Sequence, residues 1–163
     1  MIRKATPHDF AFVHGMYMHP EVNRFLLYEV MDTDEFRPVF DELLERGVKY
    51  IYENDELPVG MFKLVPNTNR SAHAVYLGGF AIHPNFAGKG YGSSMMNEII
   101  QYAGQRGFLR IELSVYTENG NARRLYEKAG FREEGILRKL TYLKSENVFL
   151  DEVLMSWLSD KIK

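Results

Sequence analysis

The sequence contains no cysteine. This single absence excludes a thiolate nucleophile, a disulfide framework and a zinc–thiolate site. The chain also lacks a surplus of either charge, because 20 lysines and arginines stand against 22 aspartates and glutamates. Composition therefore gives no reason to expect a nucleic-acid partner. The five histidines show no spacing that places two imidazoles and a carboxylate on one helix face, so we expect no metal site.

Long apolar runs and an apolar leader are missing as well. No run approaches the ~20 residues that a membrane helix needs, and the first residues lead directly into polar sequence without a signal-peptide pattern. Of the 163 residues, 45% are hydrophobic and 26% charged, which is typical of a soluble globular protein. We therefore expect one domain over residues 1–163, a cytoplasmic location and no membrane partner.

The hydrophobic pattern alternates between strand-like and helix-like segments. Apolar residues at helical spacing, capping residues and a following glycine predict four helices, at residues 7–18, 31–46, 90–105 and 119–129. Alternating or near-continuous apolar runs predict seven strands, at residues 2–6, 49–53, 59–65, 73–82, 109–115, 131–143 and 148–157. Pro38 weakens the second helix unless that helix begins near it. This order predicts an α/β fold with one mixed sheet and helices on both faces.

A glycine-rich segment lies between the strand at 73–82 and the helix that follows it. Three glycines at alternate positions, Gly88, Gly90 and Gly92, allow the backbone to turn tightly and to approach a ligand closely. The helix start adds free N–H groups and the positive end of its dipole, which together suit a pyrophosphate. The spacing fits neither a P-loop nor a Rossmann fingerprint, and a plain glycine turn without ligand is the alternative.

The segment Ala87–Gly92 resembles the pyrophosphate loop of the GNAT family of N-acetyltransferases, whose pattern is Gln/Arg-x-x-Gly-x-Gly/Ala. Both glycines of the pattern are present, and Ala87 stands where the family usually has Gln or Arg. A second stretch, residues 119–131, resembles the family signature Asn-x-x-Ala-x-x-Leu-Tyr-x-Lys-x-Gly-Phe. The two motifs follow each other in the family's order, and the likeness covers residues 47–157.

This resemblance implies a mixed, mostly antiparallel central sheet with helices on both faces, and an enzyme that moves an acetyl group from acetyl-CoA to an amine. Tyr126 resembles the family's general acid, and Asn119 the residue that hydrogen-bonds the pantetheine arm. The residues expected to bind the cofactor are Phe80, Ala81, Ile82, Ala87, Gly88, Lys89, Gly90, Tyr91, Gly92, Asn119 and Tyr126. Lys89, Arg123, Arg124 and Lys128 are candidates for its phosphates or for ordinary surface charges.

Acetyl transfer to an amine also needs an oxyanion donor and a route for the amine proton. Gly78-Gly79 inside a strand indicates either a bulge that frees backbone groups for the cofactor or a simple kink. Glu112 lies in the apolar strand 109–115, so it is the candidate general base, with a salt bridge as the alternative. His73, Tyr116 and Tyr142 are lesser candidates.

The acceptor is left open as a small-molecule amine or a peptide or protein N-terminus. The tail segments 134–138 and 151–155 resemble members that acetylate protein N-termini, polyamines or amino acids. Alternatives to the acetyltransferase are another acyl donor such as succinyl-CoA, a non-catalytic acyl-CoA-binding module and a structural dimer partner. The apolar late strands are also compatible with a homodimer.

Overall fold

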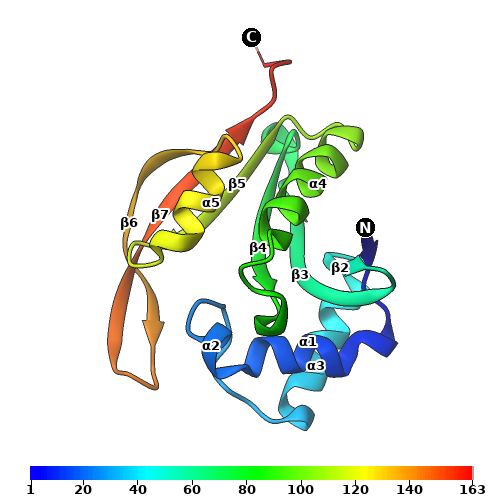
Figure 1. Ribbon diagram of the computed structural model, residues 1–163. Coiled ribbons are helices and arrows are strands. Elements are labelled where there is room, and N and C mark those ends of the chain that lie inside the picture. The colour runs from blue at the N-terminus through cyan, green and yellow to red at the C-terminus, as the bar shows by residue number, and fades with distance from the viewer. Residues whose placement is uncertain (163) are drawn as a thin grey trace. The chain divides into compact units, whose positions relative to one another are not determined.

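The computed structural model describes residues 1–162, and within them one mixed sheet has the strand order β1-β2-β3-β4-β5-β7-β6 (Figure 1). Its strands are β1 Ile2–Lys4, β2 Lys49–Asn54, β3 Leu57–Pro66, β4 Ala74–Ile82, β5 Arg110–Tyr116, β6 Arg132–Leu143 and β7 Val148–Leu158. The β4–β5 pair is parallel, whereas β1–β2, β2–β3, β5–β7 and β6–β7 are antiparallel. This confirms the predicted α/β fold with a mixed, mostly antiparallel sheet.

The chain divides into two compact units. The first unit contains Met1–Leu64 and Gly79–Met95, and the second contains Val65–Gly78 and Met96–Lys163. Strands β3 and β4 and helix α4 (Tyr91–Gln105) contribute residues to both. The expectation of one domain over residues 1–163 stays a prediction.

In the first unit, helix α3 (Thr33–Glu45) begins with a complete capping box. The Asp32 side chain accepts hydrogen bonds from the backbone of Asp34 and Glu35, and the Glu35 side chain accepts one from the backbone of Asp32. Phe36, Phe40 and Leu43 lie at helical spacing and are buried. The cap and this buried face stabilise the helix, so it continues past Pro38, the residue expected to weaken it.

The segment before α3 contains more and shorter helical elements than the pattern predicts. A 3₁₀ turn at Pro7–Asp9 precedes α1 (Phe10–Met18), and a short helix α2 (Pro20–Asn23) follows it. The prediction had one continuous helix over 7–18 and no α2, because elements of three or four residues are too short to show a helical period. Val13, Met16 and Tyr17 of α1 pack with Phe36 and Phe40 of α3 in the core of this unit.

In the second unit, β5 is the central strand between the start of β4 and β7. Ile111, Leu113 and Val115 are buried on one face, and Glu112 and Ser114 are half-buried on the other, as the alternation predicts. Helix α5 (Gly120–Lys128) follows β5 and lies beside the β6–β7 hairpin (Figure 1). No helix within residues 1–162 is long and apolar enough to cross a membrane.

Candidate active site

Strand β4 is bent at Gly79, in the first unit. Gly79 has a φ of +57°, a left-handed conformation that confirms the irregularity expected at Gly78-Gly79. A Cβ atom built at Gly79 would lie 2.7 Å from the Tyr17 hydroxyl oxygen and 3.7 Å from Lys49 Nζ. Only glycine therefore fits this point of the strand, on conformational and on steric grounds. The candidate cofactor residues Phe80, Ala81 and Ile82 follow directly in β4.

Lys49 and Tyr17 form a buried polar pair beside this bend. Both side chains are essentially inaccessible, and Lys49 Nζ donates a hydrogen bond of 3.1 Å to the Tyr17 hydroxyl. Burial, reinforced by the charge of Lys63, holds the pKa of Lys49 well below the ordinary value of a lysine. This pair was not among the residues predicted from the sequence. The signal was the alternation of Lys49 with Ile51, which places a lysine on the same strand face as a core residue.

The glycine loop before α4 has the geometry expected of an anion-binding turn. Gly88 and Gly90 have φ values of +73° and +83°, and a Cβ at either would meet no atom within 4 Å. The loop backbone is thus open to a close approach. Helix α4 begins at Tyr91, one residue later than predicted, and the first N–H groups of any helix have no partner inside it.

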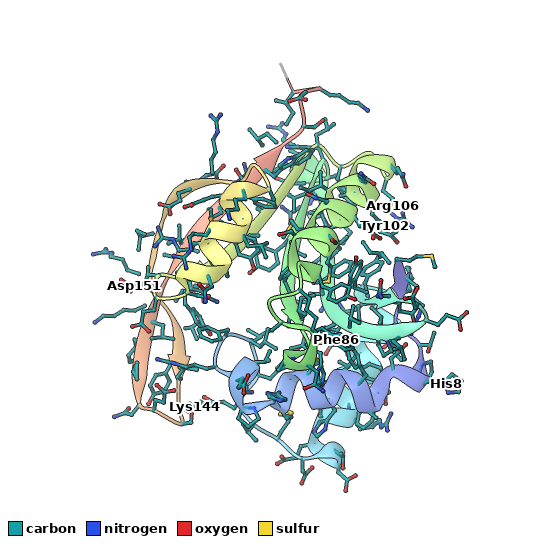
Figure 2. All side chains as sticks on the ribbon, viewed as in Figure 1. His8, Phe86, Tyr102, Arg106, Lys144 and Asp151 are labelled. Carbon is teal, nitrogen blue, oxygen red and sulfur yellow. The ribbon has the colours of Figure 1, made fainter. Side chains whose placement is uncertain are left out.

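Side chains of the loop turn back onto it. Lys89 Nζ donates a hydrogen bond of 3.0 Å to the Asn85 carbonyl and lies 5.6 Å from the centre of the Phe86 ring. Phe86 stands in the short 3₁₀ turn before the glycines (Figure 2). Because Lys89 already has these partners, the backbone N–H groups of residues 88–92 are the better candidates for holding a phosphate, whereas the Ala87 N–H already donates to the Pro84 carbonyl.

In the second unit, Asn119 and Tyr126 stand at the two ends of α5. Asn119 is the N-cap, and its Oδ1 accepts a hydrogen bond of 3.2 Å from the Ala122 N–H, so the helix proper starts one residue after the predicted Asn119. Tyr126 is 7% exposed, and its ring packs against that of Phe131. Burial, with a smaller effect of Tyr76, raises the pKa of Tyr126 above its ordinary value. The phenol therefore stays protonated at neutral pH.

The basic residues of α5 differ in their partners. Arg123 donates to the Thr117 carbonyl and to the Glu133 carboxylate, while its Nε is buried with no hydrogen-bond partner in the described structure. Arg124 donates to Asn121 on the same helix. Lys128 is exposed in the last turn. The contacts of Arg123 and Arg124 stabilise the start of α5 and its connection to β6, which supports the surface-charge alternative for both.

Glu112 is held in a polar network of the second unit. Its Oε1 accepts a hydrogen bond of 3.0 Å from Asn67 Nδ2, and its Oε2 accepts a hydrogen bond of 3.0 Å from Arg110 Nε. Arg110 also makes two hydrogen bonds of 2.7 Å to Glu134, which accepts a further one from Ser156. The Arg110 guanidinium and the Ser156 hydroxyl lower the pKa of Glu134 to about 2. Both oxygens of Glu112 are thus engaged, and its role as the base stays a prediction.

Replacing Glu112 by glutamine tests that role. Because the carboxylate is bound to Arg110, we expect a lower melting temperature, by about 1–4 °C for a half-exposed ion pair, and an unchanged acid limb of the pH–rate profile. The measurement is thermal unfolding together with kcat/KM from pH 5 to 9. Loss of the acid limb in Glu112→Gln would instead establish Glu112 as the base, since a base must be deprotonated to act.

The predicted site residues therefore fall into two groups. The bend of β4 and the glycine loop belong to the first unit, and Glu112, Asn119 and Tyr126 belong to the second. Of His73, Tyr116 and Tyr142, only Tyr116 is buried. Within residues 1–162, no three histidine, aspartate or glutamate side chains gather in a way that could hold a metal ion.

Comparison with known proteins identifies the family. The model of the acetyltransferase (GNAT) family matches residues 22–131, about two thirds of the chain. An uncharacterized N-acetyltransferase of Bacillus subtilis, YoaA, is 26% identical over 87% of this chain and 84% of its own. The spermidine N(1)-acetyltransferase of Vibrio cholerae is 28% identical over 79% of this chain and 76% of its own.

Solved structures share the fold. The spermidine N-acetyltransferase of Vibrio cholerae in complex with CoA and spermine aligns with a TM-score of 0.84 at 21% identity, over 99% of this chain and 96% of that one. The ribosomal-protein-alanine N-acetyltransferase of Brucella melitensis aligns with a TM-score of 0.79 at 20% identity, over 97% of this chain and 99% of that one. From the glycine loop, the α5 signature and the match over residues 22–131 together, the chain belongs to the acetyltransferase (GNAT) family.

Proposed function

We propose that the protein transfers an acetyl group from acetyl-CoA to a primary amine of a small molecule or of a peptide or protein N-terminus, by direct attack in a ternary complex. The observation that carries this proposal is the open glycine loop at the start of α4. The family match spans residues of both units, which supports their acting as one acetyltransferase domain. Relatives that are named spermidine and spermine acetyltransferases support an amine acceptor.

In this proposal the cofactor is held mainly by backbone groups. The N–H groups of residues 88–92 bind the pyrophosphate, because they gather at the positive end of α4, while Ala87 contributes only its place in the turn, since its N–H donates to the Pro84 carbonyl. Backbone groups of Phe80, Ala81 and Ile82, just after the bend of β4, pair with the pantetheine arm and with the acetyl oxygen. The amide nitrogen of Asn119 donates to the same arm, since its oxygen already caps α5.

The chemistry then needs one nucleophile and one acid. The neutral amine nitrogen attacks the thioester carbon, the tetrahedral intermediate collapses, and the carbon–sulfur bond breaks. The departing thiolate takes the phenolic proton of Tyr126, and the extra proton of the attacking nitrogen leaves to a base or to water, from which the phenolate is reprotonated. The raised pKa of Tyr126 keeps the phenol in the protonated form that a general acid needs.

A thiol-release assay tests the proposed function. Acetyl-CoA is offered with a panel of amino acids, polyamines, aminoglycosides and peptides of different N-termini, and free CoA is measured. We expect release that depends on both the acceptor and the enzyme. A rise in melting temperature with acetyl-CoA but no release with any acceptor would instead indicate a non-catalytic acyl-CoA-binding module.

Replacing Gly90 by valine tests the cofactor loop. The residue has a φ of +83°, and a β-branched side chain there is strained and stands where a phosphate must approach. We expect the Kd for acetyl-CoA to rise at least about tenfold, and clearly more than in Lys89→Ala, whose ammonium already binds within the loop. Titration calorimetry measures both.

Gly135→Val is the matched control for this experiment. Gly135 lies in strand β6, its φ is not positive, and a Cβ there meets no atom within 4 Å, so valine is tolerated. We expect acetyl-CoA affinity to be unchanged in this variant. If Gly90→Val binds acetyl-CoA as tightly as wild type, the proposal that the pyrophosphate binds at this loop is wrong.

A further inference from the structure

Glu152 is a buried carboxylate that has no positive partner. It lies in β7 of the second unit, is 7% exposed, and accepts a single hydrogen bond of 2.6 Å, from Thr141 Oγ1. No ion pair to it exists within the described part of the chain. A carboxylate removed from water is costly unless a cation or several donors compensate it. One hydroxyl is a small compensation for this charge, and the second carboxylate oxygen, which is not among the buried polar atoms without a partner, still reaches solvent.

The neighbours of Glu152 do not supply the missing charge. The register places Glu152 beside Tyr116 of β5 and Leu137 of β6, with Leu150 and Leu154 two residues away along β7. None of these side chains is basic. The basic residues nearest in β6, Arg138 and Lys139, lie at the register shift between Leu137 and Thr141 and are exposed.

The surroundings of Glu152 are apolar on one side. Tyr116, Leu143 and Leu150 form a small buried cluster on the same part of the hairpin. Tyr116 and Glu152 are cross-strand partners, so their side chains leave the same face of the sheet. A charged group flanked by an aromatic ring and two leucines suits a ligand with an ammonium on an alkyl chain.

The sheet face that carries Tyr116 and Glu152 is the one opposite to α5. The turn after α5 packs on the other face, because a Cβ built at Gly130 would lie 3.4 Å from Trp157, the cross-strand partner of Ile111. Glu152 nevertheless lies close in the structure to Asn119, because it pairs with Tyr116 at the end of β5, and Asn119 follows that end by three residues. The Thr117 N–H donates to the carbonyl of Asp151, which Figure 2 labels, and the Asn119 N–H donates to the carbonyl of Tyr116.

Building on the proposed function, we infer that Glu152 binds a second, non-reacting ammonium group of the acceptor, so that the substrates are amines with two positive charges. In a ternary complex the acceptor must approach the thioester where the cofactor does not lie. The oxygen of Glu152 that still reaches solvent, on the face opposite to the turn after α5, offers this approach. The carboxylate does not serve the reacting nitrogen, because a negative neighbour raises the pKa of an ammonium and would keep it protonated.

The test compares two acceptors of equal length, 1,4-diaminobutane and 4-amino-1-butanol, in wild type and Glu152→Gln. Glutamine keeps the shape and can still accept from Thr141, but it removes the charge. We expect wild type to prefer the diamine in kcat/KM, and the preference to fall about tenfold or more in Glu152→Gln, the range of a hydrogen bond to a charged group. The KM for acetyl-CoA is expected to be unchanged.

Two controls separate recognition from structure. Thr141→Val removes the hydrogen bond and keeps the charge, so we expect it to retain most of the preference for the diamine. Glu127→Gln removes an exposed carboxylate of α5 and is expected to change nothing. Equal loss of the preference in Thr141→Val and Glu152→Gln would overturn the inference in favour of a purely structural pair.

A binding experiment makes the outcome independent of turnover. Calorimetric titration of 1,4-diaminobutane into the protein saturated with CoA is expected to show binding in wild type and at least about tenfold weaker binding in Glu152→Gln. No binding to wild type, or equal binding to both, overturns the inference. Failure of the proposed function looks different, because then no amine of the whole panel releases CoA.

Discussion

Replacing Tyr126 by phenylalanine is expected to lower kcat about 100-fold, near the low end of general acid catalysis, while the Kd for acetyl-CoA changes little. The substitution removes one oxygen and keeps the ring, so its packing against Phe131 remains. A thiolate is a tolerable leaving group, which is why the lower end of the range applies. The loss should be the same from acidic to mildly alkaline pH, because the raised pKa keeps the phenol protonated throughout.

The experiment needs kcat, the Kd for acetyl-CoA and the melting temperature from one preparation of Tyr126→Phe. A tyrosine that served packing alone would instead lower the melting temperature and leave the rate per folded molecule intact. Tyr102→Phe is a suitable control, because Tyr102 is a tyrosine of the same unit, in α4, to which no catalytic role is assigned. A wild-type kcat in Tyr126→Phe would end the general-acid proposal.

Replacing Gly79 by alanine is expected to destabilise the protein by about 2–5 kcal/mol, the sum of overpacking and of a left-handed conformation at a non-glycine residue. The new Cβ would lie 2.7 Å from the Tyr17 oxygen, and Tyr17 is fully buried and held by Lys49. Neither side can move away cheaply. The melting temperature should fall by roughly 5–15 °C, and acetyl transfer should fall further because β4 is displaced next to Phe80.

A double-mutant cycle identifies the cause. Tyr17→Phe removes the oxygen that the new Cβ meets, so the pair Gly79→Ala/Tyr17→Phe should lose less stability than the two single changes added together. Gly15→Ala, in helix α1 of the same unit, has open space around its Cβ and should be neutral or slightly stabilising. Strict additivity of the two changes would show that contact with Tyr17 is not the source of the loss.

The location of the elements followed from the sequence, because hydrophobic period and capping residues act within a few residues of each other. The strand 73–82 appears as Ala74–Ile82, the helix 90–105 as Tyr91–Gln105 and the strand 148–157 as Val148–Leu158. The strands predicted at 49–53 and 59–65 are joined by a tight turn at Asp55-Glu56, with positive φ at both residues. The glycine loop and the α5 signature are also contiguous, and they were enough to predict the family.

What a side chain touches depended on the tertiary structure. Glu112 is bound by Asn67, which is 45 residues away in the sequence, and no local pattern encodes that contact. The buried partnership of Lys49 with Tyr17 spans 32 residues. In both cases a charged group either stays hydrated or is buried beside a partner. Which of the two occurs depends on the distant segments that bury it. The sequence by itself determined the longer elements, the glycine loop and the family, because these depend on neighbouring residues. Only the tertiary structure decided which charges are paired and which, like that of Glu152, are buried without a cation, because the energy of a charge depends on everything packed around it.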